Sequence, residues 1–534
     1  MTDTEVNPTR DDRLAAATNG MVLAFHARRA PDRPAFISEA GDRTFGELNA
    51  NANRLVRALR RRGVNAGDSL VLVCSNRPEF AEVLNAASRM GVRTTPANWH
   101  LTGDELAYIV ENTEAKAIVG DARFSNAVAA AADQSPNTSV RIAVGGAIDD
   151  FEAYDELIAD ESVDDIEDPT LGRTMLYTSG TTGRPKGVDR PPVGQRGDTA
   201  VASALATANS YNPATDAHLC TGPLYHAAPL AFSLSGPLAA GVTVVVMDGW
   251  EPEETLRLIE RYRITHTHMV PTMFHRLLAL PDEVKRKYDT SSLRVVLHGA
   301  APCPVAVKAG LIEWLGPVVY EYYAATEGGG TFVDSEEWLR KPGTVGKPVD
   351  PELIHILDSD GNQLPIGEVG TVYMRAPNRG RFSYYKDDAK TASSYRGNYF
   401  TLGDHGYLDE DGYLFLTGRS AELIISGGVN IYPAEVDAVL LTHPAVADAG
   451  TIGIPNLEWG EEVKAVVELK PDSQPSASLA AELMQWCRDR LAHYKCPRSV
   501  DFVAELPRHD NGKLYRRKLR ELYVQDEDPT GHRR

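Results

Sequence analysis

The sequence predicts an α/β fold in which parallel sheets are covered by helices. Short apolar runs alternate with amphipathic stretches over roughly the first 340 residues, an order typical of strand–helix–strand units. After residue 341 the apolar runs are separated by turn sequences and indicate antiparallel or barrel-like strands. A chain of 534 residues has room for about three or four domain-sized units and for a large core.

The first part of the chain contains six apolar runs that we expect to be buried strands. They are residues 69–74, 116–119, 175–177, 242–247, 266–270 and 295–297. Amphipathic helices are expected between these runs, at residues 45–62, 78–90, 253–262 and 304–314. The Ala-rich stretch 127–133 is expected to be a helix as well.

The second part has a different pattern. Strands are expected at 368–375 and 412–417, with a turn at Asp409-Glu-Asp-Gly412. A further unit begins near residue 418, with helices at 433–441 and 479–491 and a strand at 463–469. The stretch 508–520 is basic, and a polar tail begins at residue 525.

Composition excludes several classes of protein. The net charge of −19 argues against nucleic acid as the main partner, because neutralising phosphates needs a basic surface. Five scattered cysteines without a C-x-x-C pair indicate neither a disulfide framework nor a zinc ribbon. No apolar run is long enough to span a bilayer. We therefore expect a soluble, cytoplasmic protein without integral membrane segments; peripheral membrane contact and a homodimer stay open.

The strongest chemical motif is the segment 176–187, Leu-Tyr-Thr-Ser-Gly-Thr-Thr-Gly-Arg-Pro-Lys-Gly. It follows a predicted strand, and its glycines let successive backbone N–H groups face one point. Hydroxyl groups and the ammonium of Lys186 add further donors, which together predict a cradle for phosphate. It is not a Walker A loop, because Gly187 stands where Ser or Thr would bind Mg²⁺.

Segment 177–187 closely resembles the phosphate loop of the adenylate-forming superfamily of acyl-CoA synthetases, peptide-synthetase adenylation domains and luciferases. More segments resemble the motifs of that family in the same order. They are Tyr323-Ala-Ala-Thr-Glu327, Gly403-Asp404, Leu416-Thr-Gly-Arg419, Ile425-Ser-Gly-Gly-Val-Asn430, Leu506-Pro-Arg508 and Asn511-Gly-Lys513. The resemblance covers nearly the whole chain. It implies a large N-terminal domain, residues 1–417, with two helix-covered sheets and a small barrel-like subdomain, and a small mobile α+β lid, residues 418–534.

The resemblance also assigns site residues. Catalytic roles fall to Lys513, Glu327, Thr326 and Thr178, and Glu327 is the expected Mg²⁺ ligand, as a hard carboxylate. Contacts to ATP or CoA are implied for Thr178, Ser179, Gly180, Thr181, Thr182, Gly183, Lys186, Gly299, Ala300, Ala301, Tyr323, Thr326, Asp404, Arg419, Ser426, Gly427, Gly428 and Lys513. Within this set the resemblance implies adenine contacts for Tyr323 and residues 299–301, ribose contacts for Asp404 and Arg419, and CoA contacts for the loop 426–428. The acyl pocket is implied at His226, Ala227, Ala324 and Gly328.

Each assignment has a structural alternative. Glu327 alone would suit an ion pair, and Asp404, which we expect in a turn, would suit an Asx turn. His226 would suit a hydrogen-bonded core position, and Lys513 a solvated charge. The sequence also departs from the family at Ala324, Leu402 and the hinge position Ala421. His266 and His268 share one strand face but lack a third ligand, so a metal site is not expected there.

These assignments predict an acyl-CoA synthetase that uses ATP, Mg²⁺ and coenzyme A. ATP and a carboxylic acid would give acyl-AMP and pyrophosphate, and the CoA thiol would then give the thioester and AMP. Small residues in the implied pocket favour a bulky apolar acid, either a medium- or long-chain fatty acid or a steroid-type carboxylate. Three alternatives stay open: a fatty-acyl-AMP ligase, an adenylation enzyme that loads a carrier protein, and a nucleotide-binding regulatory protein without turnover.

Overall fold

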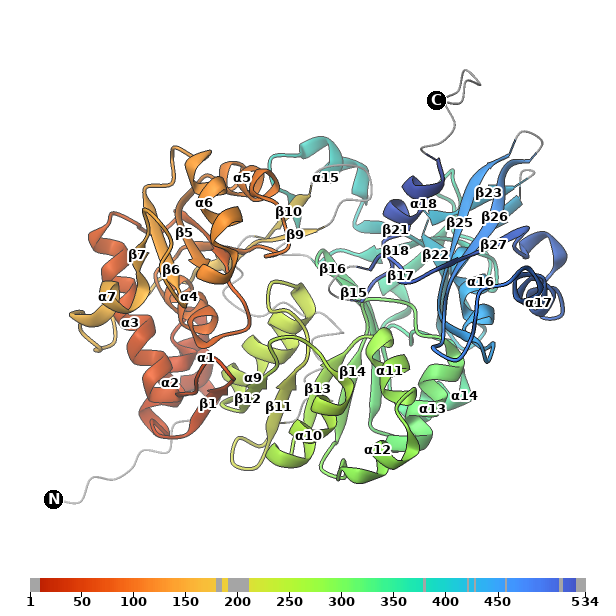
Figure 1. Ribbon diagram of the computed structural model, residues 1–534. Coiled ribbons are helices and arrows are strands. Elements are labelled where there is room, and N and C mark those ends of the chain that lie inside the picture. Colours follow the sequence, from red (N-terminus) through yellow and green to blue (C-terminus); the bar gives the residue numbers. More distant parts are fainter. Residues whose placement is uncertain are drawn as a thin grey trace.

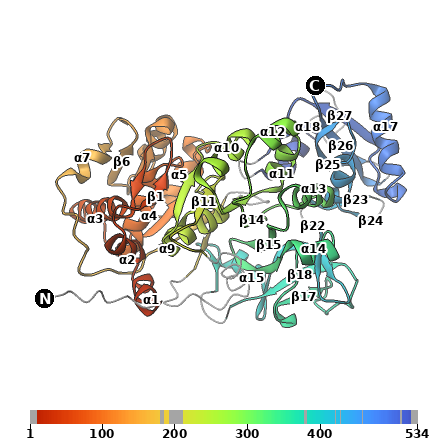
Figure 2. The same ribbon diagram turned by 90° about the horizontal axis from the view of Figure 1, so that it is seen from below.

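The chain is seen in a computed structural model that describes residues 10–178, 185–190, 211–377, 381–419, 422–426, 429–456, 459–508 and 512–524. Figures 1 and 2 show the N-terminal, central and C-terminal parts following one another across the molecule. No helix in the described ranges is long and apolar enough to cross a membrane.

The central sheet has eight strands in the order β16-β15-β14-β13-β11-β12-β1-β2. Its inner strands are parallel, and β2 and β16 pair antiparallel at the two edges. The strands are β1 (Pro34–Ile37), β2 (Arg43–Thr44), β11 (Ala217–Cys220), β12 (Thr243–Val246), β13 (His266–Met269), β14 (Val295–His298), β15 (Val319–Ala325) and β16 (Gly328–Val333). Chain order reverses between β11 and β13, so their carboxyl ends form the switch point where open α/β sheets bind ligands.

A second, wholly parallel sheet has six strands in the order β7-β6-β5-β3-β4-β8. The strands are β3 (Ser69–Val73), β4 (Arg93–Pro96), β5 (Ala115–Asp121), β6 (Val140–Val144), β7 (Glu152–Ala153) and β8 (Arg173–Thr174). All five residues of β3 are buried, as expected for a strand covered on both faces. The switch point of this sheet lies between β3 and β5.

Helices cover both sheets. Those of the first 160 residues are α1 (Arg10–Thr18), α2 (Val22–Arg29), α3 (Phe45–Arg61), α4 (Pro78–Arg89), α5 (Gly103–Asn112), α6 (Ser125–Asp133) and α7 (Tyr154–Ala159). Further along are the π-helix η2 (Pro229–Ser235), α9 (Gly236–Ala240), α10 (Pro252–Tyr262), α11 (Pro271–Leu278), α12 (Asp282–Lys287), α13 (Val305–Leu315), α14 (Ser335–Arg340) and α15 (Asp388–Ser394). Local sequence starts several of them: α3 begins with a complete capping box from Thr44 and Glu47.

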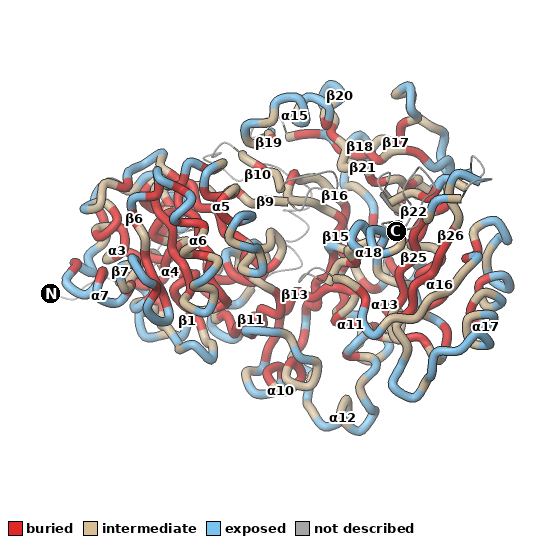
Figure 3. The backbone as a smooth tube through the Cα atoms, turned by 45° about the horizontal axis from the view of Figure 1, so that its top comes forward, coloured by how far each residue is buried: buried red, intermediate tan, exposed pale blue. Residues whose placement is uncertain are grey.

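Three further sheets follow, antiparallel except for the parallel pair β26–β27 in the last of them. One contains β17 (Ile354–Leu357), β18 (Gly370–Arg375), β20 (Tyr395–Arg396), β21 (Tyr399–Leu408) and β22 (Leu414–Arg419), and a smaller one contains β9 (Leu176–Thr178), β10 (Lys186–Asp189) and β19 (Ser383–Tyr384). The C-terminal sheet contains β23 (Ile424–Ser426), β24 (Val429–Ile431), β25 (Val446–Asn456), β26 (Gly460–Leu469) and β27 (Ser499–Val503), with α16 (Pro433–Leu440), α17 (Ala477–Arg488) and α18 (Arg516–Val524). Figure 3 shows buried residues along the strands of each large sheet and exposed residues on the outer helices.

The predicted fold class is confirmed: helix-covered parallel sheets, an antiparallel subdomain and a smaller C-terminal α+β part are all present. The largest miss is β25, which pairs along its whole length with β26. Asp448, Gly450, Gly453 and Pro455 interrupt the apolar pattern of that segment, so its sequence does not look like a strand. The boundary between domains near residue 417 stays a prediction.

Candidate active site

The acidic motif Thr326-Glu327 lies in the turn between β15 and β16. Glu327 is buried, with 7% of its surface exposed, and its Oε1 accepts a hydrogen bond of 2.8 Å from the Tyr384 hydroxyl. Burial, and then the nearby Glu327 carboxylate, raises the pKa of Tyr384, so this hydroxyl stays a donor. Oε2 of Glu327 has no hydrogen-bond partner within the described residues.

The turn that carries Glu327 suits Mg²⁺ only if a phosphate group of the substrate binds the same ion. The described residues include no group of three or more His, Cys, Asp or Glu that could hold a metal ion. Mg²⁺ is usually bound through one or two carboxylates together with substrate phosphates and water. A single oriented carboxylate with one oxygen left over meets that requirement, so Glu327 would hold Mg²⁺ together with ATP, and the ion would there neutralise phosphate charge.

A buried arginine that the sequence analysis did not single out supports the same turn. Arg190 follows β10, and its Nη2 donates to the carbonyl oxygen of Thr326 at 3.0 Å. A Cβ atom at Gly328 would lie only 2.7 Å from this nitrogen, and Gly328 has φ +119°, so a glycine is needed there. Burial lowers the pKa of Arg190, while Glu327 raises it. The guanidinium therefore both holds the turn and places positive charge beside it.

The lysine of the phosphate loop lies on the neighbouring small sheet. Lys186 begins β10 and pairs with Thr178 of β9 across the ladder. Its Nζ lies 2.6 Å from Asp387 Oδ2, a hydrogen bond that lowers the pKa of Asp387. β19 pairs with β10 and carries Tyr384, the partner of Glu327. The small sheet thus links the predicted phosphate and metal residues.

The predicted adenine platform lies at the carboxyl ends of β14 and β15. A Cβ atom at Gly299 would lie 2.6 Å from Tyr322 Cζ and 2.7 Å from its carbonyl oxygen, so only glycine fits. Ala300 has φ +68°, a conformation rare outside glycine, and Ala301 completes the turn. The hydroxyl of Tyr323 donates to Asp404 Oδ2 at 2.7 Å, which joins the predicted adenine and ribose residues.

Asp404 is not in a turn, and this corrects the expectation from its sequence. It lies within β21, directly opposite Arg419 of β22 in the antiparallel register. Gly403 before it has φ +79°, and the register shifts between His405 and Gly406, so the segment has the glycines of a turn but stays in the ladder. The two motifs are therefore neighbours across two consecutive strands.

The C-terminal lysine loop contacts the switch point of the central sheet. The carbonyl oxygen of Gly512 accepts from Thr272 Oγ1 of α11 at 3.2 Å and from Arg508 Nη1 at 2.7 Å. Gly512 has φ +76°, and a Cβ atom there would lie 2.1 Å from Thr272 Oγ1. Lys513, the next residue, is therefore brought to the carboxyl end of β13. The β23–β24 hairpin lies apart from β14 and β15 in both ribbon views (Figures 1 and 2).

Some predicted residues lie outside the described part of the chain. These are Ser179, Gly180, Thr181, Thr182 and Gly183 of the phosphate loop, Ala421 of the hinge, and Gly427 and Gly428 of the CoA loop. For Arg419 only the backbone is described. Ser426 ends β23 and pairs with Gly460 of β26. The roles assigned to these residues stay predictions.

Aromatic side chains gather where the resemblance places the acyl group. Phe232 of η2 lies edge-on to Tyr322 of β15, with ring centroids 5.0 Å apart. His268 of β13 lies 5.9 Å from Phe232 and exchanges a 3.0 Å hydrogen bond with the Tyr322 hydroxyl. Ala228 and Ala324 pack against this group. His226 opens the turn before η2, and its ring lies 4.4 Å from that of Tyr225.

One asparagine fixes the segment that carries His226. Asn76 follows β3 and is 3% exposed. Its Nδ2 donates to the carbonyl oxygens of Gly222 and Met247 at 3.0 and 2.8 Å, and its Oδ1 accepts from Leu224 N at 3.0 Å. The end of the six-stranded sheet thereby positions the loop after β11. The sequence gives little sign of this role, because a polar residue after a strand usually belongs to a turn.

Comparison with known proteins decides the family. The model of the AMP-binding enzymes matches residues 23–384, and that of the AMP-binding enzyme C-terminal domain matches residues 435–513. The chain belongs to the AMP-binding enzyme family. Within it, the chain is an AMP-forming carboxylate–CoA ligase, and the use of ATP and CoA follows from that membership.

Relatives in this family act on different acids. A 2-succinylbenzoate–CoA ligase of Geobacillus kaustophilus is 34% identical over 499 residues, which are 93% of this chain and 96% of that protein. A feruloyl-CoA synthase of an Amycolatopsis species is 31% identical, covering 93% and 97%. A fatty acid–[acyl-carrier-protein] ligase of Streptomyces coeruleorubidus is 31% identical, covering 94% and 96%.

Solved structures agree with the fold. An anthranilate CoA ligase in complex with anthranoyl-AMP superposes with a TM-score of 0.84 at 25% identity, covering 94% of this chain and 96% of that one. The o-succinylbenzoate CoA synthetase of Bacillus subtilis with its acyl-adenylate intermediate gives 0.76 at 30% identity, covering 93% and 97%.

Proposed function

We propose that this AMP-forming ligase activates an aromatic carboxylic acid. The observation that carries the proposal is the Phe232–Tyr322–His268 group, with Ala228 and Ala324 packed against it. Aromatic rings favour edge-to-face or offset contacts with another ring. Because the two alanines pack against the buried cluster that contains Tyr322, they leave less depth for a long chain than their size alone suggests. Several relatives are named for aromatic acids.

In the first half-reaction a carboxylate oxygen attacks the α-phosphorus of ATP, and pyrophosphate leaves. The chain contributes position and charge: Lys186 and Arg190 supply positive charge beside the turn, and the backbone at Gly299 and Ala300 leaves room for a flat base. The pair Tyr323–Asp404 holds an aromatic platform next to a carboxylate that can accept from ribose hydroxyls. Mg²⁺ held at Glu327 would lower the cost of bringing negative groups together.

In the second half-reaction the CoA thiol sulfur attacks the acyl carbon, and AMP leaves with the bonding electron pair. Gly512 is packed at the switch point, so the described arrangement suits acyl-AMP formation. We infer that the C-terminal part must turn before residues 426–428 can reach the same place.

The test is a pyrophosphate-release screen over benzoate- and cinnamate-type acids, fatty acids from acetate to long-chain acids, and steroid-type carboxylates. Each reaction is run with and without CoA, and with a holo carrier protein as a second acceptor. An aromatic acid should give the highest kcat/KM, and CoA should yield a thioester. A fatty acid or steroid acid in first place would contradict the substrate class, and transfer to the carrier alone would contradict the acceptor.

Variants locate the specificity. Phe232→Ala should lower kcat/KM for the best aromatic acid about tenfold or more, because an aromatic contact and its buried area are lost. The matched control is Phe332→Ala, since Phe332 packs on the same cluster and its ring contact among the described residues is with Tyr320, not with Phe232 or His268. Equal losses in both variants would indicate general damage to the cluster.

A further inference from the structure

A basic cavity lies at the opposite edge of the central sheet from the catalytic turn. It has a volume of about 580 Å³, within the range of small-molecule sites. Its lining comes from α1, α2, the segment before β11 and the end of α9. Figures 1 and 2 both show α1, α2 and α9 close together. Since these segments precede β11 and β12, the cavity faces the amino ends of strands whose carboxyl ends carry the site.

The lining residues are Arg13, Phe25, His26, Arg29, Ala30, Arg33, Asn212, Pro213, Ala214 and Ala240. Three of the ten are arginines, and none is acidic. The remainder supply one aromatic ring and several small apolar surfaces. In a protein with a net charge of −19, a cavity whose charged lining residues, among those described, are all arginines favours an anion.

The positive charge of Arg33 is not compensated by a carboxylate within the described chain. Its one hydrogen bond there is from Nη1 to the carbonyl oxygen of Pro213, at 3.3 Å, and its Nε is buried without a partner. The guanidinium lies over the Phe45 ring at 4.9 Å. Burial lowers the pKa of Arg33, with no carboxylate among the causes. A guanidinium with five N–H donors thus uses one of them, weakly.

The other two arginines of the lining add positive charge to the same cavity. Arg13 is exposed and forms no ion pair with a described residue. Arg29 lies over the Phe25 ring at 5.3 Å. His26 is 6% exposed, and the carbonyl of Ala239 lies 3.0 Å from its Nε2. Burial first, and then Arg33, Arg13 and Arg29, lowers the pKa of His26. The three arginines therefore disfavour a charged imidazole at His26.

We propose that this cavity binds a small molecule bearing a phosphate group, at a site separate from the catalytic centre. Planar guanidinium groups pair with phosphate oxygens through two N–H bonds each. Three of them around one cavity match the several oxygens and the double charge of a phosphate ester better than a single carboxylate. The Phe25 ring and the prolyl and alanyl surfaces suit an apolar substituent on that ester.

The test is titration calorimetry on the whole chain with phenyl phosphate, and with inorganic phosphate as the probe without a substituent. We expect saturable binding of both, tighter for phenyl phosphate, and weaker as salt is raised. Arg33→Gln and Arg13→Gln should each weaken binding about tenfold, since each removes a charged donor. Arg286→Gln changes an exposed arginine far along the chain and is the matched control, with an expected change below twofold.

Phosphate can also bind at the catalytic phosphate loop, so a second pair of variants separates the two places. Lys186→Ala should leave the binding assigned to the cavity unchanged, whereas Arg33→Gln should weaken it about tenfold. Loss in Lys186→Ala with no loss in either arginine variant would overturn the proposal. Because Arg13 is exposed, Arg13→Gln keeps the test decisive even if Arg33→Gln does not fold. None of these measurements needs turnover, so they do not depend on the proposed substrate.

A final arm separates a free phosphate ester from a lipid headgroup. Sedimentation with phosphatidylcholine vesicles, with and without phosphatidic acid, is compared for the unchanged protein and Arg13→Gln. Phenyl phosphate binding without vesicle binding supports a soluble ligand. Vesicle binding that needs both phosphatidic acid and Arg13, without binding of phenyl phosphate, would overturn a small-molecule site and reassign the cavity to a membrane.

Discussion

The six-stranded and the eight-stranded sheet differ in what lies at the carboxyl ends of their parallel strands. Both sheets have a switch point where α/β proteins usually bind ligands, between β3 and β5 in one and between β11 and β13 in the other. At the switch point of the six-stranded sheet, the buried carboxylates are paired with an arginine from the same part of the chain. The eight-stranded sheet leaves its switch point to a loop from the other end of the chain.

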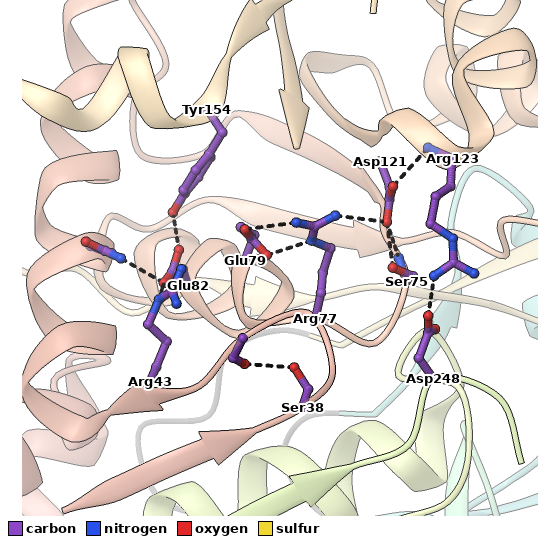
Figure 4. A network of polar contacts seen from close by, with 12 residues as sticks. Ser38, Arg43, Ser75, Arg77, Glu79, Glu82, Asp121, Arg123, Tyr154 and Asp248 are labelled. Atoms are coloured by element: carbon purple, nitrogen blue, oxygen red, sulfur yellow. Dashed lines mark hydrogen bonds and ion pairs between the residues drawn. The ribbon is translucent and has the colours of Figure 1, made fainter. Parts of the chain in front are cut away.

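Figure 4 shows how the first switch point is closed. Asp121, at the end of β5, accepts from Ser75 Oγ at 2.5 Å and lies 3.6 Å from Arg77 Nη1. Arg77 also donates to Glu79 at 2.7 Å, and a Cβ atom at Gly145 would collide with its guanidinium at 1.8 Å. Every charge there has a partner within the chain, so no group is left to bind a ligand.

At the second switch point the partners come from elsewhere. Gly512 packs against Val270 and Thr272 after β13, and the loop after β11 carries His226. Neighbouring β15 ends in Glu327, which keeps one oxygen without a protein partner in the described chain. The two sheets have the same kind of switch point. The comparison teaches that such a switch point becomes a binding site only where its polar groups lack hydrogen-bond or ion-pair partners in the adjacent loops.

The largest effect should follow from removing the positive charge of Lys513 at the switch point of the eight-stranded sheet. Lys513→Ala should lower acyl-AMP formation by about 10²–10³, because one oriented electrostatic contact to developing charge is lost. Conversion of supplied acyl-AMP and CoA to thioester should continue. Pyrophosphate release and thioester formation, assayed separately, measure the two steps. Lys518→Ala, an exposed lysine on α18, is the control, and equal slowing of both steps in Lys513→Ala would contradict the prediction.

At the switch point of the six-stranded sheet, removal of a positive charge should lower the stability of the fold and leave the rate of catalysis unchanged. Arg77→Met leaves the buried carboxylates of Glu79 and Asp121 without their cation, which should cost about 3 kcal/mol of the free energy of unfolding. Urea unfolding measures it, and kcat/KM of the folded enzyme should not change. Arg141→Met breaks an exposed pair with Asp133 and should cost under about 0.5 kcal/mol. A loss of activity without loss of stability would mean that this edge is a site after all.

Acid should weaken the sheet that carries the site. His218, His266, His268 and His298 are buried in β11, β13 and β14, whereas the strands of the six-stranded sheet contain no histidine. Burial lowers the pKa of His266 to about 4 and of His268 to about 3, and lowers the pKa of His218 and His298 well below the ordinary value.

Because the unfolded chain binds protons below about pH 6.5 and the folded chain does not, stability falls as pH decreases. Each histidine should contribute a loss of roughly 2 kcal/mol between pH 6.5 and 5. Urea unfolding at pH 7.5 and 5 measures this loss of stability. In His218→Asn the loss should be smaller by the contribution of one histidine, roughly 2 kcal/mol. His493 is exposed, so His493→Asn should leave the loss of stability unchanged. An identical pH dependence in all three proteins would refute the argument.

The smallest effect concerns the support of Glu327. Tyr384→Phe removes the hydroxyl that orients the carboxylate and should lower kcat/KM about tenfold, with a higher Mg²⁺ concentration needed for half-maximal rate. Adenylation rates over a Mg²⁺ series measure both. Tyr385→Phe, the adjacent residue whose hydroxyl contacts Arg93 and Glu114, is the control. An unchanged Mg²⁺ dependence in Tyr384→Phe would show that this hydrogen bond does not prepare a metal site.

The sequence by itself determined the elements and the chemical motifs. Periodicity placed α3 and β3 within a residue of their ends, since apolar spacing reflects which face is buried. The Thr326-Glu327 pair after a strand, and Lys186 after a glycine-rich loop, are local patterns. They could be found because the residues that define each of them are adjacent in the chain.

Only the tertiary structure decided which of these residues meet. Tyr384 lies 57 positions from Glu327, and Asp387 lies 201 positions from Lys186. The register of β21 and β22 places Asp404 opposite Arg419, and nothing in the spacing of either motif predicts that register. Local sequence sets the conformation and the buried face of each element. Whether a polar group at the end of an element has a hydrogen-bond partner depends on side chains that distant segments bring to it. The ion pairs after β3 and the Glu327 oxygen that has no partner among the described residues could therefore be told apart only in the folded chain.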